Sequence, residues 1–407
     1  MTAEVTIRIV QSLGDVGRDA WDSVANPGWR MGPGGRLEAA GPTPHPFNPF
    51  VTHDFLWTLE ETGCATDGTG WHARHLLMEN AAGAVVAAAP AYLKTHSQGE
   101  YVFDHGWANA FQRAGGRYYP KVQVSVPFTP VTGRRLLVGD VADPEAHAGA
   151  LGRGIAELAR RSQASSAHVT FLPEPEWRLL GEEDFLLRTD QQFHWLNEEY
   201  RGFEDFLANL ASRKRKTIRR ERRDAVADGI AIEWVTGAAI TEAHWDAFFA
   251  FYMDTGSRKW GRPYLNRRFF SRIGERMAER ILLVMAKRAG RWIAGAINFI
   301  GSDALYGRNW GAVEDHPFLH FEVCYHQAID FAIAHRLARV EAGAQGEHKL
   351  ARGYRPVTTW SAHWIAEPGF RRAIEDYLLR EREAVAEAQE ELAAAGPFRR
   401  GPVQEED

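Results

Sequence analysis

The segment EHKLARGYRP (residues 347–356) gathers side chains that could act on a substrate. Its candidates are Lys349 as a catalytic residue and Arg352 and Tyr354 as substrate contacts. A lysine ammonium can donate to a carbonyl oxygen or a phosphate that gains negative charge during a reaction. We therefore expect a loop that holds a site residue, in which Gly353 permits the turn. The alternative is a solvated surface turn in which Lys349 forms an ion pair with Glu347.

The strongest concentration of charge is the segment SRKRKTIRRERR (residues 212–223), which has eight basic residues and one acid, Glu221. At helical spacing, Arg215, Arg219 and Arg222 share one face. Like charges this dense destabilise an isolated helix, and guanidinium groups pair bidentately with phosphate oxygens. The segment therefore predicts contact with a phosphate or a nucleic acid, and we assign Arg215 and Arg219 to substrate binding. The alternative is a solvated helix face that nearby acids neutralise.

An apolar helix is expected over HPFLHFEVCYHQAIDFAIAHRL (residues 316–337), and it carries one polar line: Glu322, His326 and Asp330 at successive steps of four. A polar line on a buried helix faces either a cleft or the solvent. The first alternative makes Glu322 and His326 catalytic candidates. His316, His320 and Glu322 also have a spacing found in zinc helices. No further strong ligand is placed by the sequence, so we expect no metal.

Composition and charge narrow the class of protein. The chain has 407 residues, of which 45% are hydrophobic and 25% charged, as in ordinary globular proteins with a large core. The net charge of −5 predicts no general attraction to DNA or to an anionic membrane. The two cysteines, Cys64 and Cys324, lie far apart, so neither a disulfide scaffold nor a cysteine-built zinc site is expected. We recognise no signal peptide and no membrane-spanning run, and we expect a cytoplasmic protein.

Several common catalytic motifs are missing from the sequence. It contains no GxxxxGK[ST] loop, no GxGxxG between a strand and a helix, and no GxSxG elbow. The sequence therefore gives no indication of a nucleotide hydrolase, a simple dehydrogenase or an α/β-hydrolase.

Two long stretches, residues 75–107 and 281–312, resemble each other. Each reads as strand, glycine-containing turn, small-residue strand, second turn and aromatic strand, and each ends near a tryptophan. Leu77 matches Leu283, and Trp107 matches Trp310. This similarity predicts a duplicated α/β domain, with chance resemblance as the alternative. We expect domains over 1–195 and 196–370, followed by a C-terminal helix and a disordered tail over 371–407.

Polar residues beside the matched tryptophans are further candidates. Asp104 and His105 precede Trp107, and Asn309 precedes Trp310. We assign Asp104, His105, Asn309 and Trp310 to substrate binding. The stretch ARVEAGA (residues 338–344) reads as a short strand that leads directly into the segment with Lys349.

The duplicated unit resembles the GNAT acyltransferase fold, and the pair resembles the tandem-GNAT FemABX family. The segments that carry the resemblance are FEVCYHQAIDFAIAHRLARVEAG, HKLARGY, SRKRKTIRRERRDAVADGI, NPFVTHDFLWTLEETG and WGRPYLNRRFF. The closest similarity is to the FemAB-like branch labelled peptidoglycan biosynthesis/recognition, from about residue 48 to residue 370. It implies an α/β protein of two tandem GNAT-like (acyl-CoA N-acyltransferase) domains, each a mixed, mostly antiparallel sheet flanked by helices.

The resemblance also implies a function. It implies an acyl- or aminoacyl-transferase that forms an amide on an amine of a phosphate-bearing acceptor, such as a peptidoglycan precursor. No cofactor is implied, because the donor, aminoacyl-tRNA or acyl-CoA, is a substrate. GNAT enzymes hold the acyl-CoA pyrophosphate on a glycine-containing loop at a helix N-terminus, whereas HPFLHFE stands here. This favours charged tRNA. The alternatives are an acyl-CoA-dependent N-acetyltransferase of a small molecule and a non-catalytic protein that binds RNA or a nucleotide-sugar.

The sequence also departs from the family at two places. The stretch EAGAQGE stands where characterised members have an Asp-Phe-Gly-Gly-like strand end, and no long helical arm is inserted in the second domain. Both departures concern the regions that define the donor and the acceptor.

Overall fold

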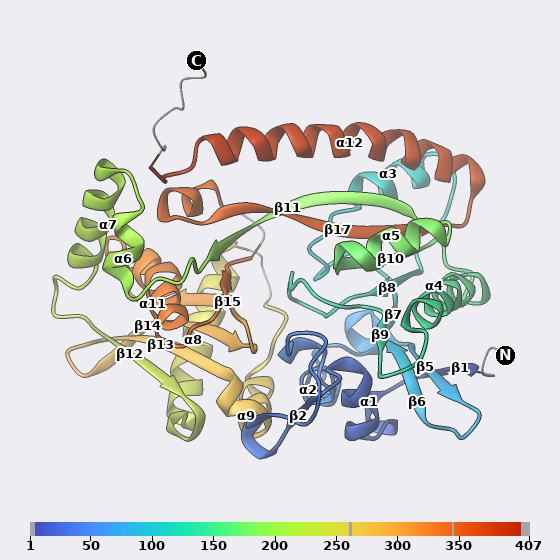
Figure 1. Ribbon diagram of the computed structural model, residues 1–407, viewed down its shortest axis with the longest axis horizontal. Helices are drawn as coiled ribbons and strands as arrows, with labels where there is room; N and C mark the ends of the chain where they lie inside the picture. Colours follow the sequence, from blue (N-terminus) through green and yellow to red (C-terminus); the bar gives the residue numbers. More distant parts are fainter. Residues whose placement is uncertain (1–4, 260–262, 344–345, 400–407) are drawn as a thin grey trace. The chain divides into compact units, whose positions relative to one another are not determined.

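The computed structural model describes residues 5–259, 263–343 and 346–399, and the chain divides into two compact units (Figure 1). Unit 1 comprises Met1–Asp190, Tyr264–Ala278 and Thr358–Ala386, and unit 2 comprises Gln191–Pro263, Glu279–Val357 and Glu387–Asp407. Each unit contains a mixed sheet with helices. The chain therefore has the predicted α/β class. Each compact unit contains segments from both of the predicted ranges, 1–195 and 196–370.

Unit 2 is built on six strands in the order β12-β13-β14-β15-β16-β11, of which β11 begins in unit 1 and enters unit 2 at Gln191. Their bounds are β12 Ala231–Thr236, β13 Ile281–Arg288, β14 Arg291–Ile300, β15 Ala304–Ala312, β16 Arg339–Glu341 and β11 Leu186–Leu196. Neighbours are antiparallel except for β15 and β16, which run parallel. β13 is buried over its first six residues, as expected for a central strand covered on both faces.

Unit 1 has two groups of strands, β1-β5-β6-β9 and β17-β10-β8-β7-β4. Their bounds are β1 Val5–Val10, β4 Trp71–Ala73, β5 His75–Asn80, β6 Val85–Ala89, β7 Ala91–Lys94, β8 Lys121–Val124, β9 Leu137–Val138, β10 Ser166–Leu172 and β17 Arg355–Ile365. Only Pro90 separates β6 from β7. A proline lacks the N–H that a central strand donates, so Pro90 divides this strand of unit 1 into β6 and β7. The corresponding strand of unit 2, β14, is continuous.

The two units repeat one topology. In unit 1, β1, β5 and the interrupted strand β6–β7 are antiparallel neighbours, and the parallel pair β8–β10 follows them. In unit 2, β12, β13 and β14 are antiparallel neighbours, and the parallel pair β15–β16 follows them. Leu77 in β5 and Leu283 in β13 lie in corresponding second strands. The last strand of each unit comes from the other half of the sequence: β10 pairs with β17, and β16 pairs with β11. The predicted duplication is therefore confirmed at the level of the fold.

Both units also contain helices. Those of unit 1 are α1 Arg18–Ala25, α2 His53–Glu61, α3 His105–Arg113, α4 Pro144–Arg161, α5 Glu174–Glu182 and α9 Arg267–Met277. Those of unit 2 are α6 Phe203–Ala208, α7 Ser212–Ala225, α8 Glu242–Lys259, α10 Leu319–Phe321, the π-helix η7 Glu322–His326, α11 Gln327–Ala334 and the 3₁₀ helix η8 Glu347–Arg352. The long helix α12, Pro368–Ala394, begins in unit 1 and ends in unit 2. Residues 400–407 of the predicted tail lie outside the described residues.

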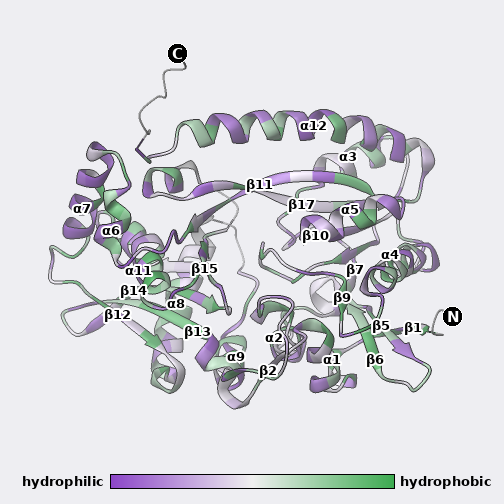
Figure 2. Cartoon of the chain, viewed as in Figure 1, coloured by the Kyte–Doolittle hydropathy of each residue, from purple (hydrophilic) through white to green (hydrophobic). Residues whose placement is uncertain are grey.

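Local chemistry explains several helix boundaries. Thr52 caps α2, since its side chain accepts from the backbone N–H of Phe55. Asp143 caps α4 in the same way, and Pro144 occupies the first position, where its missing N–H costs nothing. The predicted basic helix over residues 212–223 forms as the single helix α7, and just before it the backbone N–H of Ala211 donates to the carbonyl of Pro397. Figure 2 shows α7 as predominantly hydrophilic.

One sequence-based expectation about the fold was wrong. Trp107 was matched to Trp310 at the end of an aromatic strand, but Trp107 lies in helix α3 and Trp310 lies in β15. The cause is a group of buried charges that fixes the preceding loop, in which Gly99 adopts a φ of +81°. The Gly- and Pro-rich stretch after α1 contains a short hairpin of β2 Trp29–Met31 and β3 Leu37–Ala39.

The buried charges of unit 1 form one connected group. The Lys121 ammonium donates to Glu100 at 2.6 Å, to Asp104 and to the Ser97 hydroxyl at 2.8 Å, and neither the lysine nor its acids are more than 3% exposed. Lys94 lies 3.8 Å from Glu100. Burial lowers the pKa of Lys94 to about 7. The group ties the loop before α3 to strands β7 and β8.

We predict that Lys121→Met destabilises the protein by about 3–5 kcal/mol, because it leaves Glu100 and Asp104 buried without their main cation. Arg8→Met is the control, since Arg8 forms a solvent-exposed ion pair with Glu79 and such pairs contribute about 0–1 kcal/mol. Urea unfolding measures both changes. Equal losses in the two variants would contradict the role assigned to the buried group.

Candidate functional site

The parallel strands β15 and β16 separate after a very short pairing. Ala304, Leu305 and Tyr306 lie opposite Arg339, Val340 and Glu341. β16 then ends, whereas β15 continues to Ala312. On its other side β15 carries a bulge, because Asn309 faces Ile297 and Gly307 faces Asn298, which leaves Arg308 as the extra residue. A bulge bends its strand and redirects a side chain, and here both effects occur where the strands part.

Arg308 occupies the point of separation. Its Nη1 donates to the backbone carbonyl of Gly307 at 2.9 Å and to that of Glu341 at 3.4 Å. Its Nη2 lies 3.7 Å from the Glu341 carboxylate, and its side chain is only 6% exposed. A positive charge is therefore held at the base of the gap between the two strands.

A small cavity opens in this gap. Its volume is about 90 Å³, and its lining residues are Ala296, Asn298, Gly307, Arg308, Asn309, Trp310, His320, Cys324, Tyr325 and Ala342. They come from β14, from the end of β15, from the residue after β16, and from the helical segment α10–η7. A cavity of this size accommodates a few non-hydrogen atoms, which suits an acyl group or a small amino-acid side chain rather than a whole substrate.

The helical wall of the cavity has unusual backbone geometry. Phe318, which precedes α10, has a φ of +61°, a region that bulky residues rarely adopt. Cys324 and Tyr325 lie in the π-helix η7, and single π turns of this kind are often found at functional sites. The Tyr325 hydroxyl lies 3.0 Å from Nε2 of His348, which connects η7 to η8. The wall is therefore tied directly to the segment that carries Lys349.

Lys349 is buried directly behind the cavity. Its Nζ donates to the carbonyl of the lining residue Ala342 at 2.7 Å and to that of Gly343 at 3.0 Å, and the residue is 3% exposed. Burial, together with the nearby Arg308 charge, lowers the pKa of Lys349 to about 8. The site thus contains two neighbouring cations.

The segment with Lys349 is not the solvated turn of the alternative interpretation. It forms a 3₁₀ helix, η8, rather than a loop. Gly353 ends it with a φ of +87°, and a Cβ at this position would lie 2.5 Å from the ring of Phe206. Glycine is therefore required by both conformation and space. The Glu347 side chain, the alternative partner of Lys349, lies outside the described residues.

Three other predicted residues lie at or beside the cavity. Asn309 and Trp310 line it. Tyr354 is fully buried and packs edge-on against the lining residue Tyr325, with ring centroids 5.6 Å apart. Tyr354 therefore supports the wall of the cavity from behind.

Glu322 and His326 do not line the cavity. They are 3% and 1% exposed, so the polar line faces neither solvent nor a cleft, and both alternatives were wrong. The line packs against α7, where Arg222 donates to Glu322 and Asp330. A buried carboxylate needs such a cation. Nδ1 of His326 lies 3.0 Å from Glu322.

The histidine that would begin a zinc site has other partners. His316 lies 3.3 Å from Asp228 and 3.0 Å from Glu314. Within the part of the chain that the structure describes, no group of three or more His, Cys, Asp or Glu side chains could hold a metal ion.

Two of the predicted anion-binding arginines have internal contacts. Arg219 pairs with Glu204 while remaining exposed, and Nη1 of Arg215 lies 3.4 Å from the carbonyl of Ala208. Arg352 was predicted to bind substrate, but its Nη2 donates to both carboxylate oxygens of Glu221 at 2.9 and 3.0 Å. A guanidinium that is 6% exposed requires a carboxylate, and Arg352 and Glu221 together also line the cavity between α7 and η8.

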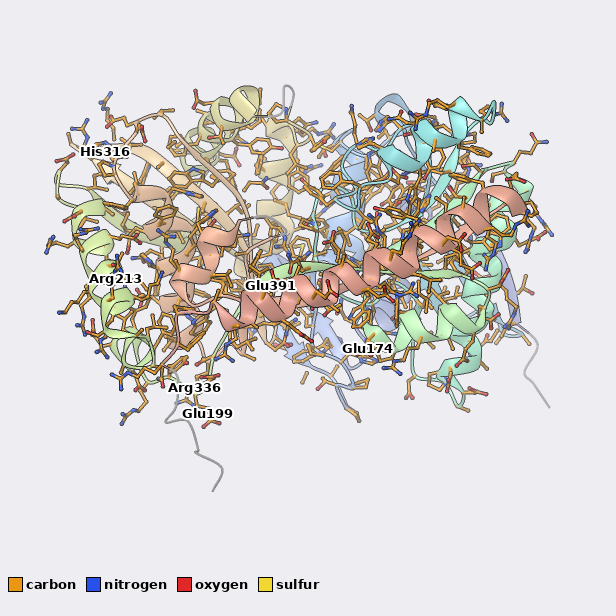
Figure 3. All side chains as sticks on the ribbon, turned by 90° about the horizontal axis from the view of Figure 1, so that it is seen from above. Glu174, Glu199, Arg213, His316, Arg336 and Glu391 are labelled. Atoms are coloured by element: carbon orange, nitrogen blue, oxygen red, sulfur yellow. The ribbon has the colours of Figure 1, made fainter. Side chains whose placement is uncertain are left out.

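Four other cations of α7 form no ion pair with any described residue: Arg213, Lys214, Lys216 and Arg220. Arg213, labelled in Figure 3, and Lys214 line a second cavity of about 350 Å³ between α7 and η8. α7 has no acid in its first turn and no side-chain cap at its N-terminus. Basic residues beside unpaired N–H groups oppose the helix dipole, so the first turn of α7 would be stabilised by an anion.

The predicted residues Asp104 and His105 belong to unit 1 and do not line the unit 2 cavity. Asp104 belongs to the buried charge group, where it accepts from Lys121 and from the Tyr118 hydroxyl at 2.7 Å. His105 is exposed at the first position of α3. Their assignment as substrate contacts therefore has no support from the cavity.

Five of the lining residues that sequence reasoning did not assign to substrate binding or catalysis have a polar or thiol side chain: Asn298, Arg308, His320, Cys324 and Tyr325, of which His320 was considered only for a zinc site. One of them had a signal, because Asn298 is an isolated amide in the apolar stretch WIAGAINFI. A polar residue in a buried strand needs a partner or a ligand. Arg308 gave no such signal, because the alternation of polar and apolar residues along a strand does not reveal a bulge.

Comparison with known proteins identifies the family and the fold. A family model described as FemAB-like, peptidoglycan biosynthesis/recognition, matches residues 12–400. The crystal structure of FemX superimposes with a TM-score of 0.54 at 12% identity, over 91% of this chain and 100% of FemX. A conserved protein of unknown function from Bacteroides thetaiotaomicron VPI-5482 gives 0.50 at 10% identity, over 89% and 100%. At these identities the structural similarity shows the fold.

A third similar structure is a tandem GNAT protein from the clavulanic acid biosynthesis pathway, with a TM-score of 0.43 at 13% identity over 90% of this chain and 99% of that chain. No curated protein matches the sequence. Among the described residues, no helix is both long enough and apolar enough to span a membrane.

We predict that Ala296→Leu abolishes substrate turnover while changing stability by no more than about 1 kcal/mol, because the cavity has room for the added carbons. Ala294→Leu is the matched control on the same face of β14: Ala294 is fully buried in the core, so the same change should cost about 1–3 kcal/mol. Chemical unfolding and turnover measure both effects. Full turnover in Ala296→Leu would show that the cavity does not hold a reacting group.

Proposed function

The chain belongs to the FemAB-like family, and we propose that it is an acyl- or aminoacyl-transferase that forms an amide bond on an amine of a phosphate-bearing acceptor. The acceptor class suggested by the family is a peptidoglycan precursor. The observation that carries the proposal is the buried Lys349 behind a small cavity, opened by the separating strands β15 and β16. This arrangement suits a reaction at a carbonyl group.

The proposed chemistry is the attack of a neutral amine on the carbonyl carbon of an activated ester. The new C–N bond converts the carbonyl oxygen into an oxyanion, the C–O bond to the leaving group then breaks, and the amine loses a proton. Holding both reactants can contribute roughly 7–11 kcal/mol, and one oxyanion donor about 3–4 kcal/mol. Lys349 is our candidate for that donor, and Arg308 is a second cation beside it.

Glu322 and His326 have a different role in this proposal from the one predicted. Their buried contacts with Arg222 and with each other suit support of the cavity wall rather than proton transfer to a substrate. Asn309 and Trp310 remain candidate contacts for the acyl or aminoacyl group, because they line the cavity.

We propose aminoacyl-tRNA as the donor in preference to acyl-CoA. The α10 helix beside the cavity has only three residues and follows His316, Pro317 and Phe318, without a glycine loop to hold a pyrophosphate. The cations of α7, by contrast, suit a larger polyanion. Arg213 and Lys214 line the second cavity, and Arg215 and Arg219 lie farther round the same helix.

A ligand screen tests the function. The protein is mixed with acetyl-CoA, with charged tRNA and with a UDP-linked peptidoglycan precursor, and its melting temperature and the transfer of a labelled acyl or aminoacyl group are measured. Ligand at a hundred times Kd stabilises a native protein by roughly 2.7 kcal/mol. We expect charged tRNA and the precursor to stabilise the protein and to support transfer together. Transfer from acetyl-CoA would identify an N-acetyltransferase, and stabilisation without any transfer would identify a binding protein.

We predict that Lys349→Met lowers kcat by about a hundredfold, the usual effect of removing one oxyanion donor. It should also cost about 1–3 kcal/mol of stability, because the carbonyls of Ala342 and Gly343 lose their buried donor. Lys349→Arg is the comparison variant, since it keeps a charged donor. Full activity of Lys349→Met at saturating substrate would remove the catalytic assignment.

The pH dependence of turnover gives a further prediction about the same lysine. Lys349 donates only when protonated, and burial lowers its pKa to about 8. The protonated form is therefore lost as the pH rises through this value, so kcat should fall above about pH 8. In Lys349→Arg this fall should disappear, because a guanidinium stays protonated. A wild-type kcat that is level from pH 7 to pH 10 would contradict the donor role.

We predict that the double variant Arg215→Gln, Arg219→Gln weakens tRNA binding and reduces its dependence on salt, because each neutralised phosphate adds to the slope. Binding is measured across a sodium chloride titration. Unchanged affinity and slope would leave the solvated-face interpretation of α7.

A further inference from the structure

Two consecutive residues of α7 contact the two segments that frame the candidate site. Glu221 contacts η8, which carries Lys349, and Arg222 contacts η7, which carries the lining residues Cys324 and Tyr325. Side chains at consecutive positions of a helix point about 100° apart, so Glu221 and Arg222 reach two different segments that pack against different sides of α7.

The contact of Arg222 with η7 is extensive. Its Nε and Nη2 donate to the two carboxylate oxygens of Glu322 at 3.1 and 3.0 Å, and Nη2 also donates to Asp330 at 2.6 Å. The guanidinium lies 4.1 Å from the ring centroid of Phe203. Glu322, the first residue of the π-helix, also accepts from Gln327 at 2.7 Å. The start of the π-helix is therefore fixed on both sides of its carboxylate.

The contact of Glu221 with η8 is equally well defined. Both of its oxygens accept from Nη2 of Arg352, whose Nη1 donates to the carbonyl of His348 at 2.8 Å. The same guanidinium stacks on Phe321 at 3.4 Å from the ring centroid. Phe321 directly precedes the π-helix. The Glu221–Arg352 pair thus joins α7, η8 and the start of η7 in one buried contact.

We propose that α7 acts as a brace, in which Glu221 and Arg222 are positioning residues that hold η7 and η8 at the geometry that transfer requires. The inference rests on the transferase function proposed above. Neither residue lines the small cavity, so each acts on that cavity through the segment it contacts, while Glu221 also lines the second cavity between α7 and η8. The same helix carries Arg215 and Arg219 toward an anionic substrate, so substrate binding and site geometry depend on one element.

The brace predicts a division of kinetic effects between residues of one helix. Loss of a bracing side chain leaves a buried charge without its partner, and the segment bearing that charge must move or take up water. Changes at Arg222 should therefore lower kcat with little change in KM. Changes at Arg215 and Arg219 should instead raise KM. A purely structural role for Arg222 would change neither parameter in protein that remains folded.

A thiol-labelling experiment tests the geometry without any substrate. The chain has two cysteines, neither in a disulfide: Cys324 is half-buried in the π-helix, and Cys64 is 2% exposed in unit 1. Iodoacetamide is added to the full-length protein, and alkylation of each cysteine is followed by mass spectrometry. In Arg222→Gln we expect Cys324 to react about tenfold faster than in wild type while Cys64 stays protected, as in a local opening.

Matched variants guard against misfolding and non-specific charge effects. Arg222→Lys keeps the charge but loses the planar group that contacts Glu322 and Asp330 together, so it should fold and show a smaller increase. Arg223→Gln removes the neighbouring arginine, which is exposed and pairs only with Asp224 among the described residues, and its Cys324 should react like wild type. Glu221→Gln should also accelerate Cys324, because it releases Arg352 from its carboxylate.

The outcomes decide the proposal. A Cys324 rate within about twofold of wild type in folded Arg222→Gln and Arg222→Lys overturns the brace, and so does equal acceleration of Cys324 and Cys64, which reports global opening. If labelling behaves as expected but no donor supports transfer in the wild type, the brace stands as a property of the fold and the proposed function fails. If transfer occurs and labelling is unchanged, the function stands and the brace fails.

Discussion

The candidate site depends on how briefly two parallel strands pair. β15 and β16 share three paired residues, and β15 then continues alone past the end of its neighbour. Backbone groups at the point of separation need new partners, and the guanidinium of the bulged Arg308 supplies them by donating to the carbonyls of Gly307 and Glu341. The interaction that stabilises the gap therefore also places a positive charge beside the space that the gap opens.

Two buried lysines, Lys121 and Lys349, have pKa values shifted in opposite directions because their partners differ. In unit 1, burial alone would lower the pKa of Lys121, but Glu100 and Asp104 raise it above its usual value, so the group is permanently charged and structural. In unit 2, Lys349 is held by two backbone carbonyls, and burial lowers its pKa to about 8. A lysine held by dipoles can change its interactions when charge develops nearby, whereas one held by carboxylates is already neutralised.

The sequence was informative where local chemistry determines structure. The turn at Gly353 and the duplicated strand pattern both follow from residue type and spacing. The sequence was uninformative where segments far apart in the chain meet. Arg222, for example, is the partner of Glu322 although it lies a hundred residues earlier. The exchange of β11 and β17 between the units and the bulge at Arg308 are also products of tertiary packing. Asn309 and Trp310, which line the cavity, and Lys349, which lies behind it, were candidates from the sequence, but the cavity itself was not predicted.

We propose that the reacting group enters the gap between β15 and β16 of unit 2. Amide hydrogen exchange tests this directly, with and without a saturating amount of whichever donor, charged tRNA or acetyl-CoA, supports transfer. We expect slower exchange at the end of β15, in η7 and in η8 when the donor is bound, because binding suppresses local opening. Protection confined to unit 1, with these three segments unchanged, would contradict it.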